Sequence, residues 1–286
     1  MISPQTTPAL GLLERLGYAA DEIHYGWLLP DGRMSVPAVV GEETGWLFLD
    51  TSRRDDLILE LSRVTKWGWP YERTNEHWGQ TTLSSFFALG RSRAAGSVEV
   101  RGTEADATKL NPNWGSLGAP FFRDTVLAID PIDTAIGLTS MIDLRDRAND
   151  AVGLPLVART RDNIPILEVL EDTKSLGGEP PRFVIDTNFA RSVISLEYID
   201  RAWPADRRRK ARQAREHQRP FNLQLRVPEV AEVIRLEPYV LERAVPVRGE
   251  DTSLRIDGYL GIDFLYRWLP VLDFRQWILW LAPLSL

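Results

Sequence analysis

Two stretches of this sequence match each other, and each contains an aspartate that ends a run of apolar residues. Residues 45–52 read GWLFLDTS and residues 181–188 read PRFVIDTN. An apolar pair begins seven positions after each aspartate, at Leu57 and at Val193. An internal repeat constrains the architecture more than any single motif, because each copy has to form an equivalent structural unit. The two aspartates are therefore equivalent, and we expect them to share one site.

A second pair of matching blocks lies further along each copy. Residues 117–122 read LGAPFF and residues 260–265 read LGIDFL. In each block the glycine precedes an aspartate by 12 positions, and these aspartates are Asp130 and Asp273. The two pairs of blocks support each other and predict a duplicated chain. We place the boundary between the copies in the polar residues 141–151, which match neither copy.

The composition is that of a globular protein, with 286 residues, 44% of them hydrophobic and 26% charged. The absence of cysteine excludes disulfides, a thiol nucleophile and a thiolate metal site. A net charge of −6 argues against nucleic acid as the main partner, and the three histidines are too scattered for a zinc site. Residues 1–8 lack the features of a signal peptide, and the apolar run 277–284 is too short to span a bilayer. We expect a cytoplasmic protein without membrane association.

The hydrophobic pattern predicts mostly strands and turns, with a few helices. Residues 1–22 hold a short helical segment that caps the body, and residues 23–40 predict a hairpin. Leu57, Ile58, Leu61 and Val64 follow the first aspartate at helical spacing. The second copy opens with strands at 154–157 and 164–170.

A family resemblance emerges from these residues taken together. In the second copy, Asp-Thr is followed by SVI at 192–194 and by DGYLGIDFL at 257–265. This combination resembles the pepsin/retropepsin superfamily of aspartic proteases, and the resemblance covers residues 23–140 and 152–284. It implies a mainly β fold, with two homologous acid-protease-like β-barrel lobes (23–140 and 152–286) joined by the linker 141–151. The lobes would be related by a pseudo-two-fold axis, in a single chain that is a monomer.

The resemblance also implies a reaction. Asp50 and Asp186 would be the catalytic dyad of an aspartic-type endopeptidase, sharing one proton because two close carboxylates cannot both ionise. The ionised member would activate a water molecule and the protonated member would polarise the carbonyl of a peptide or protein substrate in the interlobe cleft. Thr51 and Thr187 match threonines that bond across the axis. No metal or other cofactor is needed.

The resemblance also identifies residues that support the two catalytic loops. Gly118 and Gly261 match the glycines on which the catalytic loops rest, where a side chain would clash. The family's Asp-Thr/Ser-Gly triplet is replaced by Asp-Thr-Ser and Asp-Thr-Asn, through Ser52 and Asn188.

Arg53 and Phe189 stand where the family has small residues, and an arginine beside Asp50 favours a doubly ionised dyad. Two hypotheses therefore remain open: an active aspartic endopeptidase, or an inactive protease-like protein that binds a peptide or protein partner in the same cleft. Without the repeat, an Asp-Thr pair after a strand would be read as a turn or a helix cap.

An aromatic segment and a basic segment each allow a functional and a purely structural interpretation. Tyr71 and Trp78 lie in an aromatic segment whose position suits a flap over the cleft, although aromatic packing under a long loop explains it equally. The basic run 207–219 predicts a helix that begins near Asp206. It either binds an acidic partner or nucleic acid, or forms a solvated helix face with salt bridges.

Overall fold

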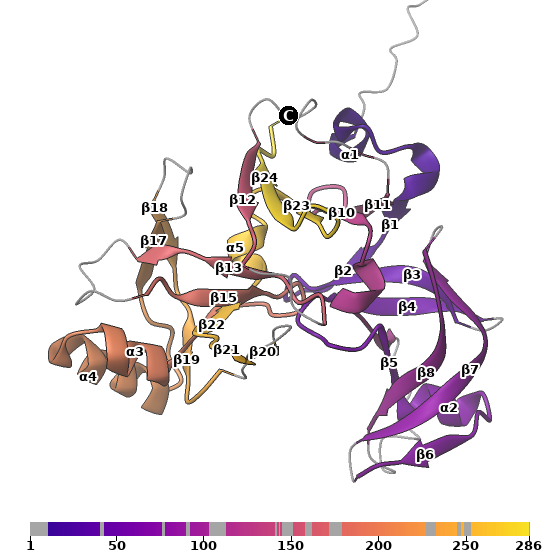
Figure 1. The fold of residues 1–286 in the computed structure, drawn as a ribbon, viewed down its shortest axis with the longest axis horizontal. Helices are drawn as coiled ribbons and strands as arrows, with labels where there is room; N and C mark the ends of the chain where they lie inside the picture. The colour runs from indigo at the N-terminus through magenta and orange to yellow at the C-terminus, as the bar shows by residue number, and fades with distance from the viewer. Residues whose placement is uncertain are drawn as a thin grey trace, which may run out of the picture.

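The chain, seen in a computed structural model, is mainly β, as the sequence pattern predicts, and its strands form several sheets (Figure 1). The structure describes residues 11–40, 43–75, 78–89, 92–102, 113–140, 142, 144, 151–157, 162–171, 179–226, 233–244, 247–248 and 253–285. Most of the expected linker 141–151 lies outside the described residues.

The first half of the chain forms an eight-stranded sheet in the order β2-β3-β4-β9-β5-β8-β7-β6. Its strands are β2 (Trp27–Leu28), β3 (Met34–Val40), β4 (Glu43–Asp50), β5 (Leu57–Glu60), β6 (Tyr71–Arg73), β7 (Trp78–Leu89), β8 (Ser92–Arg101) and β9 (Asn113–Gly118). β4 alternates between buried and half-buried residues, so Leu47 and Leu49 enter the core while Trp46 and Phe48 do not. An additional pairing of β3 with β7 curls this sheet.

The pairing directions determine where the Asp50 loop runs. β4 is parallel to β9, and β9 is antiparallel to β5. β9 therefore lies between the two strands that flank residues 51–56. The loop that begins at Asp50 has to cross the end of β9, where Gly118 is the last residue.

The second half contains a five-stranded sheet with the order β13-β15-β22-β16-β19. Its strands are β13 (Ile166–Glu168), β15 (Arg182–Ile185), β16 (Val193–Ser195), β19 (Tyr239–Leu241) and β22 (Gly258–Leu260). Their successive pairings are antiparallel, parallel, antiparallel and parallel. The run β3-β4-β9-β5-β8 in the first sheet has the same sequence of directions. The Asp186 loop consequently crosses the end of β22 as the Asp50 loop crosses the end of β9.

A six-stranded sheet joins the two halves, in the order β1-β11-β10-β23-β24-β12. Its strands are β1 (Ile23–Tyr25), β10 (Val126–Asp130), β11 (Ala135–Thr139), β12 (Val152–Pro155), β23 (Leu269–Asp273) and β24 (Ile278–Ala282). β10 and β23 pair antiparallel, with Leu127 opposite Leu272. Every residue of these two strands is buried, so this sheet forms part of the interior.

The distal aspartates of the sequence repeat close two equivalent turns in this sheet. Asp130 Oδ1 accepts the backbone N–H groups of the second and third residues after it, and Asp273 Oδ1 does the same. A positive φ at Thr134 and at Trp277 precedes the returning strand in each case. Asp130 and Asp273 therefore have a structural task and lie apart from the Asp50 and Asp186 loops.

The helices are short and cover the sheets. They are α1 (Leu12–Leu16), α2 (Leu61–Lys66), α3 (Leu196–Ala202), α4 (Ala205–Glu216) and α5 (Ile262–Leu265), with 3₁₀ turns at Ala20–Glu22 and Ala119–Phe122. Small sheets are formed by β14 (Leu170–Glu171), β17 (Leu223–Arg226) and β18 (Val233–Leu236), and by β20 (Val247–Arg248) with β21 (Ser253–Leu254). α1 packs its leucines against Val126 and Val271 of the six-stranded sheet. The main core is one cluster with residues from both halves, among them Leu47 and Ile185.

Two details differ from the sequence-based expectation. Leu57 and Ile58 belong to strand β5, and the helix α2 begins only at Leu61. Their spacing fits a helix, but pairing of β5 with both β8 and β9 supplies backbone hydrogen bonds that override the local preference. The basic helix α4 is present, but its N-cap is Pro204, and Asp206 lies in the first turn.

Candidate active site

The two aspartate loops rest on backbone atoms of the strands that they cross. A Cβ atom at Gly118 would lie 1.9 Å from the carbonyl oxygen of Asp55, and one at Gly261 would lie 2.5 Å from that of Phe189. Both glycines have ordinary negative φ values, so the close approach of the loop, and not the backbone conformation, excludes a side chain. Hydrogen bonds from the backbone N–H groups of Gly118 and Ile262 to the crossing loops hold this arrangement.

Two threonines connect the loops to each other. The backbone N–H of Thr51 donates to Thr187 Oγ1 at 3.2 Å, and the N–H of Thr187 donates to Thr51 Oγ1 at 3.3 Å. The hydroxyl of Thr51 in turn donates to the carbonyl oxygen of Ile185 at 2.7 Å. Both threonines are fully buried, so these bonds form away from competing water. The structure therefore brings the loops of Asp50 and Asp186 into direct contact.

Asp50 is buried and bonded to three side-chain donors. Ser52 Oγ donates to Oδ1 at 2.7 Å, Arg53 Nε donates to Oδ2 at 2.9 Å, and Asn188 Nδ2 donates to Oδ2 at 3.1 Å. A carboxylate offers about four acceptor positions, so three are used and one remains on Oδ1. The guanidinium makes an ion pair with this carboxylate while a third of its own side chain stays exposed. All three donors are residues at which the sequence departs from the aspartic protease pattern.

Asp186 has a different environment. Its side chain is fully buried, Oδ1 accepts the backbone N–H of Asn188 at 2.8 Å, and Oδ2 has no hydrogen-bond partner among the described residues. Burial and then repulsion from the neighbouring Asp50 carboxylate raise the pKa of Asp186 to about 7. The Asn188 N–H, the nearby Ser52 hydroxyl and the Arg53 charge partly oppose this rise in pKa. Below about pH 7 the site therefore holds one neutral carboxyl beside an ion-paired aspartate.

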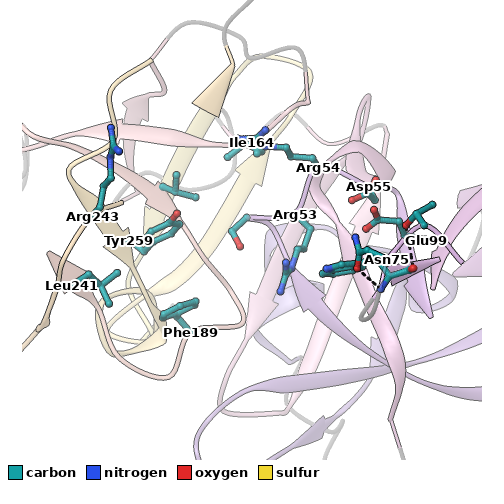
Figure 2. A pocket seen from close by; sticks show the side chains of 14 residues that line it. Arg53, Arg54, Asp55, Asn75, Glu99, Ile164, Phe189, Leu241, Arg243 and Tyr259 are labelled. Atoms are coloured by element: carbon teal, nitrogen blue, oxygen red, sulfur yellow. Dashed lines mark hydrogen bonds between the residues drawn. The ribbon is translucent and has the colours of Figure 1, made fainter. Parts of the chain in front are cut away.

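A cavity of about 540 Å³ opens beside these loops and is lined by residues from both halves of the chain (Figure 2). Arg53 lies in the middle of the view, with Asp55, Asn75 and Glu99 on one side of it. On the other side lie the rings of Phe189 and Tyr259, stacked at 5.6 Å between centroids. The volume is within the range of ligand-binding pockets, which is about 300–1,000 Å³.

The two candidate flap residues differ in their relation to the cavity. Trp78 lines the cavity together with Thr74 and Asn75, which belong to the turn between β6 and β7. Tyr71, at the start of β6, does not line it. The turn of this hairpin therefore reaches the cavity from the first half, as the Asp50 loop and β8 also do.

Sequence reasoning missed the contribution of Asp55 and Glu99. Their carboxyls share a hydrogen bond, and burial followed by mutual repulsion raises the pKa of Glu99. Burial also raises the pKa of Asp55. No local signal joins two residues so far apart in the sequence. They meet because β5, which follows the Asp50 loop, pairs in parallel with β8.

Neither a metal cluster nor a membrane-spanning helix is found in the part of the chain that the structure describes. No group of three histidine, aspartate or glutamate residues there is placed to hold a metal ion. No helix there is long and apolar enough to cross a membrane.

Comparison with models of known protein families and with curated protein sequences finds no match to this sequence.

Proposed function

We propose that this chain is a two-lobed, aspartic-protease-like protein that hydrolyses peptide bonds with an Asp50/Asp186 dyad. The observation that carries the proposal is a buried carboxyl, with its pKa raised to about 7, in a loop that reciprocal threonine hydrogen bonds join to the loop of an ion-paired aspartate. Such an asymmetric pair is what general acid–base hydrolysis by two carboxyls requires. Under this proposal the lobes are residues 23–140 and 152–286.

The strand topology supports the pseudo-two-fold relation between the lobes. Five strands in each half have the same order and pairing directions, and both glycines lie under equivalent loops. The six-stranded sheet is composed of three strands from each half, and the central pair β10 and β23 is antiparallel. A two-fold axis between Leu127 and Leu272 would exchange these strands and would also exchange the two aspartates.

The proposed mechanism assigns one role to each carboxyl. Asp50, which is paired with Arg53, acts as the base and accepts a proton from a water molecule through the remaining acceptor position of Oδ1. The oxygen of that water attacks the carbonyl carbon of the peptide. Asp186 donates its proton to the carbonyl oxygen, which gives a gem-diol. Asp50 then passes the proton that it took from the water to the leaving nitrogen, the C–N bond breaks, and Asp186 recovers a proton from a hydroxyl of the gem-diol as the carboxylic acid product forms. Since Asp186 has to be protonated, turnover should fall as the pH rises through about 7.

A second candidate function is peptide or protein binding without hydrolysis. The observation that favours it is the number of donors on Asp50, since Ser52, Arg53 and Asn188 together occupy three of its acceptor positions. In particular, the side-chain amide of Asn188 reaches Asp50 from the opposite loop and donates to its Oδ2. The same cleft would then hold a peptide that is never cut.

Mass spectrometry of a mixed peptide library distinguishes the two candidates. Wild type, Asp50→Asn and Asp186→Asn are incubated with the library between about pH 3 and pH 8. We expect cleavage by wild type alone, with the lower rates at the alkaline end. Ser52→Gly and Asn188→Gly serve as matched variants that return each loop to the family pattern. If wild type and both glycine variants cleave nothing, the hydrolase proposal is wrong and the binding candidate replaces it.

A further inference from the structure

The cavity beside the dyad has two chemically different ends. On the side of the second half, Phe189 and Tyr259 form a stacked aromatic shelf, and Leu241 lies next to it (Figure 2). Phe189 is 40% exposed, although a phenylalanine in a protein of this size is usually buried. An exposed aromatic surface inside a concave site is suited to an apolar side chain of a ligand.

The other end of the cavity is acidic. Asp55 and Glu99 lie side by side there, and Trp78 and Asn75 also line this end. Among the described residues, neither carboxyl makes a direct ion pair, although the Arg53 charge acts on both and opposes the rise of their pKa. The two are hydrogen-bonded to each other instead.

The arginines of the cavity do not cancel this charge. Arg53 is paired with Asp50, Arg54 lies 3.8 Å from Asp162, and Arg243 lies 3.2 Å from Glu197. Each therefore has a carboxylate partner outside the lining of the cavity. The Arg53 charge also acts on Asp55 and Glu99 through space, but its Nε is bonded to Asp50, so the Asp55/Glu99 end keeps negative charge that makes no direct ion pair with a described residue.

We propose that the cleft selects extended peptides that place an arginine or lysine at the Asp55/Glu99 end and an aromatic side chain on the Phe189/Tyr259 shelf. A cation between the two carboxyls relieves their repulsion. The aromatic side chain extends the existing stack. The inference rests on the proposed function, because it requires that the cleft holds a peptide, whether or not the peptide is cut.

Fluorescence anisotropy with two pools of labelled decapeptides tests this selectivity. The peptides have an alanine–serine background with one phenylalanine and one arginine, at all spacings and in both orders. The matched pool carries citrulline, a neutral isostere, in place of arginine. With Asp186→Asn protein, which cannot cut the peptides, the arginine pool should bind at least about tenfold more tightly, which corresponds to about 1.4 kcal/mol.

Variants of the acidic end identify where the preference arises. Asp55→Asn combined with Glu99→Gln should bring the two pools to equal affinity, and Phe189→Ala should weaken both pools while keeping their ratio. Glu99→Lys should favour a third pool with glutamate in place of arginine, and circular dichroism verifies the folding of each variant. Equal binding of both pools to Asp186→Asn protein, or a preference that survives the double substitution, overturns the inference but leaves the proposed function standing. Failure of every pool to bind would contradict both.

Discussion

Replacing Asp186 by asparagine tests the protonation of the buried carboxyl without any knowledge of the substrate. The pKa of Asp186 is about 7 in the folded chain, against an ordinary value of 3.8. Between these two values the folded state binds one more proton than the unfolded state, so stability decreases as the pH rises. The stabilisation is fully present below about pH 4 and is lost as the pH passes through about 7.

The size of the effect follows from the separation of the two pKa values. They differ by about three pH units, and each unit corresponds to 1.36 kcal/mol, so the total is about 4 kcal/mol as an order of magnitude. Burial and repulsion by Asp50 both disfavour the charged form, and asparagine in its place cannot acquire a charge. Asp186→Asn should therefore match wild type near pH 4 and exceed its stability by up to about 4 kcal/mol near pH 8.

Urea unfolding followed by circular dichroism at several pH values measures this difference. The useful quantity is the change with pH in the stability difference between variant and wild type, because titrating groups that do not interact with Asp186 contribute equally to both proteins. Asp206→Asn, at an exposed position of α4, is the matched control and should follow the wild-type curve. A gap between Asp186→Asn and wild type that is constant from pH 4 to pH 8 would refute the assignment of a raised pKa to Asp186.

Substitutions at four further positions test the support of the site. Gly118→Ala and Gly261→Ala should each destabilise the fold by about 1–3 kcal/mol or more. Gly118→Ala should cost more, because its Cβ approaches a carbonyl oxygen more closely. If both variants unfold at the same urea concentration as wild type, the loops do not cross the glycines as described. Thr51→Val should cost about 1–3 kcal/mol for each buried partner left unsatisfied, and Thr51→Ser should recover most of that loss in the same assay. Asn188→Gly removes a donor from the Asp50 carboxylate and should keep or raise kcat/KM for a cleaved peptide; a large loss would show that this amide assists the reaction.

Several parts of the site can be recognised in the sequence because they depend on local or repeated patterns. The alternation in β4 and the apolar run of β15 predict strands that end at aspartates. The glycines of the second matching block are identified by their constant spacing to Asp130 and Asp273, and the structure explains that spacing by the turns which these aspartates close. The dyad itself remains a prediction, which the contact between the two loops supports.

Three other features of the fold and the site could not be predicted from sequence patterns. Leu57 and Ile58 have helical spacing and yet form β5, because their hydrogen-bond partners lie in β8 and β9. The sequence places Arg53 near Asp50 but does not reveal that its guanidinium turns back onto Oδ2. The amide of Asn188 reaches the same oxygen from the opposite loop, and no local pattern predicts a contact between loops so far apart in the chain.

The sequence by itself determined the mainly β character and the two matching aspartate segments, because these follow from hydrophobic periodicity and from repetition along the chain. The glycines beneath the loops were expected from the family resemblance alone. Only the tertiary structure decided which donors meet Asp50, why Asp186 keeps its proton, and that Asp55 and Glu99 share one end of the cavity. The physical reason is that burial, charge repulsion and hydrogen bonding between distant segments act through space. Their strength depends on distances that exist only after the sheets have paired.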